Sequence, residues 1–184
     1  MQLKIHATTV LCVRGAKKVA MASDGQVTLG EAIMKHGGRK IRRLREGTVL
    51  AGFAGGAADG FALFSRFEEK LEEHRGNFER SAVELVKDWR MDRALRHLEA
   101  LLVVADEKRV FVLSGTGDLI EPDDGIATIG SGAPMALAAA RALVAHTSLE
   151  PGKVARESLL IAAGIDIYTN TEITLEELDA WSTT

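Results

Sequence analysis

The chain has 184 residues, of which 46% are hydrophobic and 27% are charged, with a formal net charge of -3 at pH 7 and one cysteine, Cys12. This composition excludes intrinsic disorder as the main state and argues against a general nucleic-acid binder. A single cysteine also excludes a disulfide framework within the chain and a zinc site built from several cysteines.

The sequence contains no segment that would direct or anchor the chain to a membrane. No apolar run approaches the ~18 residues of a membrane span, and residues 1–7 lack the apolar core of a secretory signal. We therefore expect one cytoplasmic domain that binds neither nucleic acid nor membrane.

The first half of the chain is predicted to form four strands and then two helices. Strands are expected at 8–14, 18–24, 39–44 and 48–54. Apolar residues then recur at helical spacing from Ala57 to His74. A second amphipathic helix begins at Phe78 and is expected to run to about Leu98.

The second half repeats this order. Strands are expected at 100–105, 109–114 and 125–130, followed by helices at roughly 133–146 and 152–164. Thr174 and Glu177 have capping-box spacing, which predicts a short helix near 175–181. Several strands are apolar on both faces, which favours a layered α/β architecture with helices outside the sheets.

Familiar catalytic and nucleotide-binding motifs are absent. There is no G-x-S-x-G elbow, no HExxH and no P-loop. Gly130-Ser131-Gly132 stands between a strand and a helix, but Met135 occupies the position of the third glycine of a dinucleotide fingerprint. Nucleotide binding is therefore not expected, although such a turn can hold a substrate carbonyl or an oxyanion.

Three residues near the N-terminus are spaced by sixteen positions: Thr8, Asp24 and Lys40. Without further knowledge they read as the start of a strand, an aspartate in a turn and a lysine on the surface.

The order and spacing of several segments are nevertheless highly specific. These are TTVLCVR, SDGQVTLG, MK…RKIRRL, VLAGFAGGAADGFALFSRFEEKLE, AVELVKDWR…LRHLEALLVVAD, IGSGAP and IYTN. Together they resemble the HslV (ClpQ) family of bacterial proteasome-like threonine proteases, from Thr8 to about Leu178. The resemblance implies the fold of N-terminal nucleophile hydrolases, a four-layer α-β-β-α sandwich, with a single catalytic domain over 8–184.

The same resemblance implies a set of catalytic residues. Thr8 matches the nucleophile, which acts once it is the first residue of the chain. Its free α-amine, with an ordinary pKa of about 7.7–8.0, would then serve as the base. Lys40 matches the lysine that keeps this amine neutral, and Asp24 matches the aspartate that pairs with the lysine.

Further positions carry over from the family. Ser131 matches a serine that hydrogen-bonds around the threonine, and the backbone N–H of Gly55 matches the oxyanion donor. Thr28 matches a residue that pairs with the extended substrate main chain. Phe53 is expected either to shape the substrate pocket or to pack in the core.

The resemblance also implies a bound monovalent cation, usually sodium. Its matching ligands are Ala163, Asp166 and Thr169, mainly through backbone carbonyls. The segment that commonly reads A-G-D-I-C in the family reads Ala162-Ala163-Gly164-Ile165-Asp166 here.

Relatives assemble as two stacked hexameric rings, a homododecamer with enclosed active sites. They are fed with unfolded proteins by the hexameric ATPase HslU (ClpY), so no nucleotide is expected on this chain. Two alternatives to this function are a non-catalytic ring subunit and an N-terminal amidohydrolase acting on small amides.

The N-terminus departs from the family pattern. Many relatives have only a methionine before the threonine, whereas here residues 1–7 precede Thr8. Cleavage between Ala7 and Thr8 would therefore be required, and the protein itself is a candidate for that step. The alternative, a translation start closer to Thr8, has no methionine to begin from.

Overall fold

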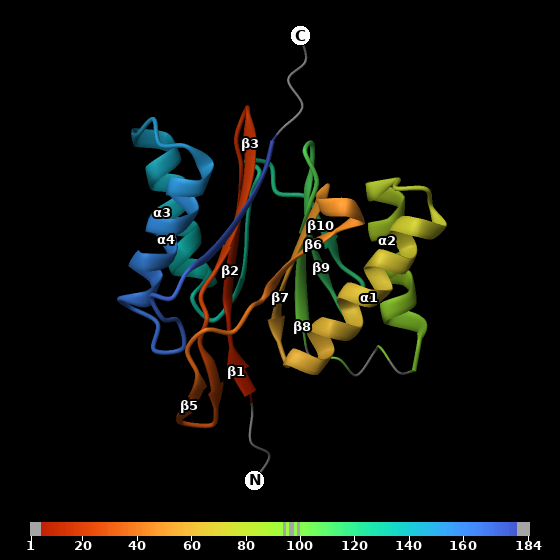
Figure 1. Cartoon of the computed structure of the whole chain (residues 1–184), viewed down its shortest axis with the longest axis horizontal. Helices are drawn as coiled ribbons and strands as arrows, with labels where there is room; N and C mark the ends of the chain where they lie inside the picture. Colours follow the sequence, from red (N-terminus) through yellow and green to blue (C-terminus); the bar gives the residue numbers. More distant parts are fainter. Residues whose placement is uncertain (1–4, 94, 96–97, 99, 180–184) are drawn as a thin grey trace.

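The computed structural model describes residues 5–93, 95, 98 and 100–179. Two antiparallel sheets face each other, and each is covered on its outer side by a pair of helices (Figure 1). The predicted four-layer α-β-β-α sandwich is thus confirmed.

The first sheet carries the N-terminal strands. Its order is β11 (Ile126–Gly130), β2 (Thr9–Arg14), β3 (Lys18–Ser23) and β12 (Thr174–Asp179). Helices α3 (Ala133–His146) and α4 (Pro151–Ala163) pack against it. The β2–β3 hairpin turns where the sequence predicts it, so the start of β2 at Thr9 and the end of β3 at Ser23 lie at the same end of the sheet.

The second sheet is built from the middle of the chain. Its order is β10 (Leu119–Ile120), β9 (Val110–Ser114), β8 (Ala100–Ala105), β7 (Val49–Gly55) and β6 (Ile41–Leu44). A short 3-10 turn, η1 (Arg45–Gly47), joins β6 to β7. Helices α1 (Ala57–Glu73) and α2 (Phe78–Met91) cover the outer face of this sheet (Figure 1).

A small third sheet projects at the end of the sandwich where β2 begins (Figure 1). It contains β1 (Ile5–Ala7), β4 (Val27–Leu29) and β5 (Ala32–Lys35), with β4 in the middle. These short strands were not predicted, because segments of three or four residues give little periodicity to detect.

Three hydrophobic clusters fill the spaces between the four layers. One packs α1 and α2 on the second sheet around Phe67 and Trp89, and another packs α3 and α4 on the first sheet around Leu11 and Leu159. The central cluster lies between the two sheets and includes Cys12. Because each sheet is buried on both faces, its strands can be apolar throughout.

Two expectations about helices are wrong. The segment near 175–181 is not a helix: residues 174–179 form β12, which pairs with β3 along its whole length. The edge of β3 needs a hydrogen-bonding partner, and this demand overrides the local capping-box spacing. Residues 180–181 lie outside the described part of the chain.

The second helix also ends earlier than expected. α2 stops at Met91, because Asp92 adopts an extended backbone with ψ 126°. Leu95 is still buried in the cluster under α1 and α2, although it lies beyond the end of the helix. Among the described helices, none combines the length and apolar character needed to cross a bilayer.

Cys12 gives a direct test of the central layer. Its side chain is fully buried, and burial raises the pKa of the thiol to about 12. We therefore expect no reaction with a thiol reagent at pH 8 in the native protein and one equivalent after unfolding in guanidinium. Rapid labelling of the native protein would contradict the packing of β2 between the two sheets.

Candidate active site

The candidate site lies where β2 begins, at the end of the two facing sheets. Thr8 immediately precedes β2, and the antiparallel β2–β3 pairing brings Asp24 beside it. The Thr9 amide donates to Asp24 Oδ1 at 2.8 Å, and the Asp24 amide donates to the Thr9 carbonyl at 3.2 Å. The strand register thus fixes the positions of Thr8 and Asp24, the first two of the three residues spaced by sixteen positions, relative to each other.

The third member, Lys40, enters from the other sheet. It stands just before β6, and its Nζ lies 2.9 Å from Asp24 Oδ1, with both side chains almost completely buried. Burial lowers the pKa of the Lys40 ammonium below its ordinary value, and the neighbouring Asp24 carboxylate opposes this shift. A buried pair of this kind needs further hydrogen bonds to offset the loss of water.

Gln26 supplies several of those hydrogen bonds. Its carbonyl accepts from Lys40 Nζ at 2.6 Å, and its amide donates to Asp24 Oδ2 at 2.8 Å. The buried Gln26 side chain donates to Thr28 Oγ1 and to the Ile167 carbonyl, each at 3.0 Å. One residue therefore ties the ion pair to β4 and to the loop after α4.

A second polar network lies on the side of the first sheet. Thr9 Oγ1 accepts from the Gly132 amide at 2.9 Å and lies 2.7 Å from Thr169 Oγ1. Asp166 Oδ2 accepts from the hydroxyls of Thr169 at 2.5 Å and Ser131 at 2.6 Å. These contacts fix the residue that follows Thr8.

Glycine is required where the chain passes Thr8. Gly130 ends β11 with φ 101°, and a Cβ placed there would lie 1.7 Å from the Thr8 carbonyl oxygen. Any side chain at this position would push the start of β2 away from the polar network.

Thr8 itself is in an unusual state. It is fully buried, and its Oγ1 has no hydrogen-bond partner among the described residues. Its φ of 103° is strained for a β-branched residue. Its nitrogen is still joined to Ala7, and β1 pairs with β4 in the register Ala7 to Val27 and His6 to Thr28.

A cavity of about 510 Å³ opens beside this threonine. Thr8, Lys40, Phe53 and Gly55 all line it. Gly55 ends β7 directly before Gly56, the N-cap of α1, so the positive end of that helix is close to the site. Phe53 is 4% exposed and packs in the core, as one of its two predicted roles requires, and it also lines the cavity.

Two further predicted residues, Ser131 and Thr28, are not among the described residues that line this cavity. Ser131 donates to Asp166 and makes no hydrogen bond to Thr8 in the described structure. Thr28 does not line the cavity; it lies on β4, where its backbone is opposite His6. Among the predicted catalytic and substrate-binding residues, the cavity therefore brings together Thr8, Lys40, Phe53 and Gly55.

The three predicted cation ligands follow one another at the end of α4. Ala163 is its last residue, while Asp166 and Thr169 belong to the loop beyond it. Carbonyls 160, 161 and 162 of the last turn accept hydrogen bonds from Gly164, Ile165 or Asp166, and no such bond to the Ala163 carbonyl is seen among the described residues. An unpaired carbonyl at a helix C-terminus fits an oxygen-liganded cation.

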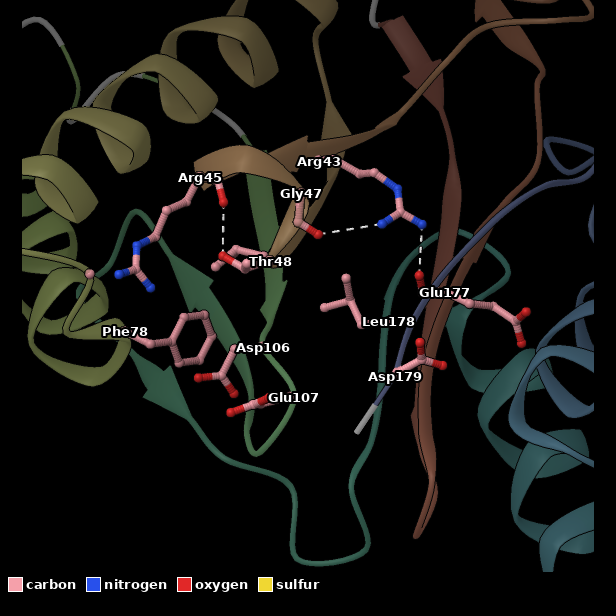
Figure 2. A pocket seen from close by; sticks show the side chains of 12 residues that line it. Arg43, Arg45, Gly47, Thr48, Phe78, Asp106, Glu107, Glu177, Leu178 and Asp179 are labelled. Atoms are coloured by element: carbon pink, nitrogen blue, oxygen red, sulfur yellow. Dashed lines mark hydrogen bonds between the residues drawn. The ribbon is translucent and has the colours of Figure 1, made fainter. Parts of the chain in front are cut away.

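A second cavity lies at the opposite end of β7. This cavity, drawn in Figure 2, measures about 420 Å³. Val49 at the start of β7 lines it, whereas Gly55 at the end of β7, roughly 20 Å along the strand, lines the Thr8 cavity. Arg43 on its wall is already bonded to the carbonyls of Gly47 and Glu177. None of the predicted site residues lines it, so the Thr8 cavity is the candidate site.

Sequence reasoning missed several residues of the site. Thr9 and Gln26 stand next to predicted residues, but their polar side chains gave no separate signal. The Asn170 side chain accepts a hydrogen bond from the Gly25 amide and donates one to the His36 carbonyl. It thereby connects the loop after Asp24 with the loop before Lys40. Its segment, IYTN, contributes only to the family resemblance, which assigns no role to Asn170.

Comparisons with known proteins identify the family of the chain. The family model described as "Proteasome subunit" matches residues 5–178. A relative from Syntrophobacter fumaroxidans, "ATP-dependent protease subunit HslV", is 59% identical over 174 residues, covering 95% of this chain and 97% of the relative. The protein of the same name from Desulfovibrio desulfuricans is 58% identical over 177 residues, covering 96% and 100%.

Solved structures give the same result. The crystal structure of eukaryotic HslV from Trypanosoma brucei matches with a TM-score of 0.89 at 42% identity, over 93% of this chain and 99% of that one. Thiobacillus denitrificans BPH matches with a TM-score of 0.72 at 19% identity, over 94% and 98% of the two chains, a likeness of fold alone.

The layered sheets and the threonine at the strand end define a proteasome-type sandwich. The chain belongs to the proteasome-subunit family, and its resemblance to HslV, expected from the sequence, is confirmed.

The ion pair can be tested through stability. Asp24→Asn would leave the Lys40 ammonium buried without its partner, which commonly costs about 3–5 kcal/mol. The double variant Asp24→Asn/Lys40→Met removes both charges and should recover a large part of this loss. Urea unfolding at one fixed protein concentration measures both, with the exposed Asp123→Asn as control.

An Asp24→Asn variant as stable as the unaltered protein would show that the pair contributes nothing to the fold. A double variant less stable than Asp24→Asn alone would contradict the uncompensated charge as the cause.

Proposed function

We propose that this chain is the proteolytic subunit of a chambered ATP-dependent protease that cleaves peptide bonds of unfolded proteins with an N-terminal threonine nucleophile. The observation that carries the proposal is the Thr8 hydroxyl, which has no hydrogen-bond partner among the described residues and lines one cavity with Lys40 and Gly55. An unengaged hydroxyl in this setting speaks for catalysis and against the non-catalytic ring subunit.

The first step is maturation of the chain. Cleavage of the bond between Ala7 and Thr8 removes residues 1–7 and leaves the Thr8 nitrogen as a free amine. The strained backbone of Thr8 supports cleavage at this peptide bond, because cleavage would relieve the strain. The new amine lies on the same residue as the hydroxyl, which is the arrangement that an N-terminal base requires.

Peptide hydrolysis then follows in two stages. The Thr8 amine takes the hydroxyl proton, Oγ1 bonds to the substrate carbonyl carbon, and the Gly55 N–H stabilises the oxyanion. The carbon–nitrogen bond breaks, and the departing amine takes the proton. The Thr8 amine then takes a proton from a water molecule, which attacks the ester. The carboxylic acid product leaves, and the Thr8 hydroxyl is restored.

Lys40 and Asp24 act on the base, without a covalent role. The Lys40 ammonium disfavours protonation of the nearby amine and keeps it able to accept a proton. Asp24 holds Lys40 in place, as their 2.9 Å contact supports. Ser131 and Asp166 hold the loop beside the threonine through their mutual hydrogen bond.

Substrate binding would use the edge of β4. In the chain as described, β1 pairs with this edge and places His6 opposite Thr28. Once residues 1–7 are gone, an extended substrate can pair with the same backbone groups in the same direction. Ala7 then marks the position of the residue before the scissile bond.

A monovalent cation, most simply sodium, would bind the carbonyls of Ala163, Asp166 and Thr169. Its chemistry is structural: it would neutralise the negative end of α4 and fix the loop that carries Asp166. That loop reaches the active site through the contacts of Thr169 with Thr9 and Asp166.

The partner would be a hexameric ATPase of the HslU type, because the similar relatives are named subunits of an ATP-dependent protease. Assembly into two stacked hexameric rings in the cytoplasm would enclose the site. Large apolar side chains that are exposed on the single chain, among them Met34, Ile165 and Ile167, support burial against neighbouring copies.

The nucleophile assignment predicts the behaviour of Thr8→Ala. We expect this variant to fold and assemble but to lose peptide hydrolysis, because no other described residue combines a free hydroxyl with this cavity. If the protein cleaves its own N-terminus, intact mass will show a chain beginning at Thr8 and an alanine variant that keeps residues 1–7. Near-normal activity of Thr8→Ala would overturn the assignment.

The chambered architecture predicts activity that depends on assembly. In analytical ultracentrifugation the chain should sediment as a large oligomer that cleaves small peptides slowly and folded proteins hardly at all. Adding the ATPase and ATP should stimulate both activities in the same fractions. A fully active monomer that gains nothing from the ATPase contradicts this architecture.

A further inference from the structure

The cavity beside Thr8 combines an apolar wall with a positively charged rim. Val27, Phe53 and Phe61 supply the apolar surface, and Lys35 and Arg39 supply the charge. The proposed catalytic chemistry uses neither of these two cations.

The apolar wall is held in place by aromatic packing. The Phe53 ring lies edge-on to Phe64 at 5.4 Å and tilted to Phe61 at 6.5 Å. Gly60 of α1 allows this, because a Cβ there would lie 2.3 Å from the Phe53 ring. Arg42 lies over the Phe61 face at 4.6 Å. The wall is therefore a fixed surface suited to the stem of one substrate side chain.

The positive charge of the rim is not compensated within the described structure. Lys35 and Arg39 are exposed, and neither has an ion pair with a described carboxylate. The charge of Lys40, by contrast, is balanced by Asp24. No Asp or Glu is among the described residues that line the cavity.

Strand register relates the rim to the scissile bond. Ala7 is opposite Val27 in the β1–β4 pair, and Val27 is opposite Lys35 in the β4–β5 pair. Residues directly opposite one another share a face of a sheet. A substrate residue bound in the register of Ala7 therefore projects its side chain on the face of Val27 and Lys35, both of which line the cavity.

Resting on the proposed function, we propose that Lys35 and Arg39 make this cavity discriminate by charge at the residue before the scissile bond. It accepts an apolar stem, prefers a carboxylate over the corresponding neutral amide, and rejects a cation. The substrate class is thus peptides cleaved after apolar or acidic side chains and not after lysine or arginine.

The test compares four peptides that differ only at the residue before the cleaved bond. Glutamate and glutamine are one isosteric pair, and norleucine and lysine are the other. With the mature, ATPase-stimulated protein at low salt, kcat/KM should be about 1.4- to fivefold higher for Glu than for Gln, the range of exposed ion pairs. Lysine should be at least about tenfold worse than norleucine.

Salt provides an internal control. In 1 M salt the Debye length is about 3 Å, so the Glu/Gln ratio should fall toward one while the norleucine peptide is still cleaved. Because this measurement uses the unaltered protein, it decides the proposal whether or not any variant folds. A Glu/Gln ratio of one or less at low salt overturns the proposal.

Variants assign the effect to the two cations. Lys35→Gln/Arg39→Gln should bring the Glu/Gln ratio near one, and Lys35→Glu/Arg39→Glu should invert it. The matched control, Lys17→Gln/Arg93→Gln, changes two exposed cations that do not line the cavity and should keep the original ratio.

An unchanged ratio in Lys35→Gln/Arg39→Gln shows that other groups select the charge and overturns the assignment. Failure to cleave any of the four peptides, even with the ATPase present, overturns the proposed function itself. The two failures are therefore distinguishable.

Discussion

The buried contact between Asp24 and Lys40 is the constraint on which the rest of the site depends. Two charges almost completely removed from water, 2.9 Å apart, are tolerable only if they compensate each other and their remaining hydrogen-bonding groups are satisfied. The backbone amides of Thr9 and Gln26 donate hydrogen bonds to the carboxylate, and the Gln26 carbonyl accepts one from the ammonium. Satisfying the pair thus draws together the start of β2, the loop after β3 and the residue before β6.

This constraint explains how much of the site could be predicted. The β2–β3 hairpin follows from local patterns, so the proximity of Asp24 to the start of β2 is a consequence of register. Lys40 directly precedes β6 of the opposite sheet, and hydrophobic periodicity does not predict how the two sheets pack against each other. Its pairing with Asp24 was expected only from the family resemblance, and the 2.9 Å contact now gives that pairing its geometry.

The features that sequence reasoning missed depend on partners far away in the chain. β12 is formed by residues whose spacing suits a helix, and it becomes a strand because β3 presents an unpaired edge about 150 positions earlier. β4 and β5 are too short to show a period, yet they carry Thr28 and Lys35 to the cavity side of the molecule. Local patterns located the long helices, apart from the end of α2, but they did not predict these short or edge strands, since an edge strand depends chiefly on its neighbour.

On the proposed function, maturation and substrate access share one physical element. A strand edge can pair with only one extended segment at a time, and the edge of β4 is paired with β1 in the described chain. The same bond that hides the Thr8 amine therefore also holds a peptide where the substrate would lie. Breaking it would release the base and vacate the edge together, so an immature subunit would lack both its catalytic base and its binding surface.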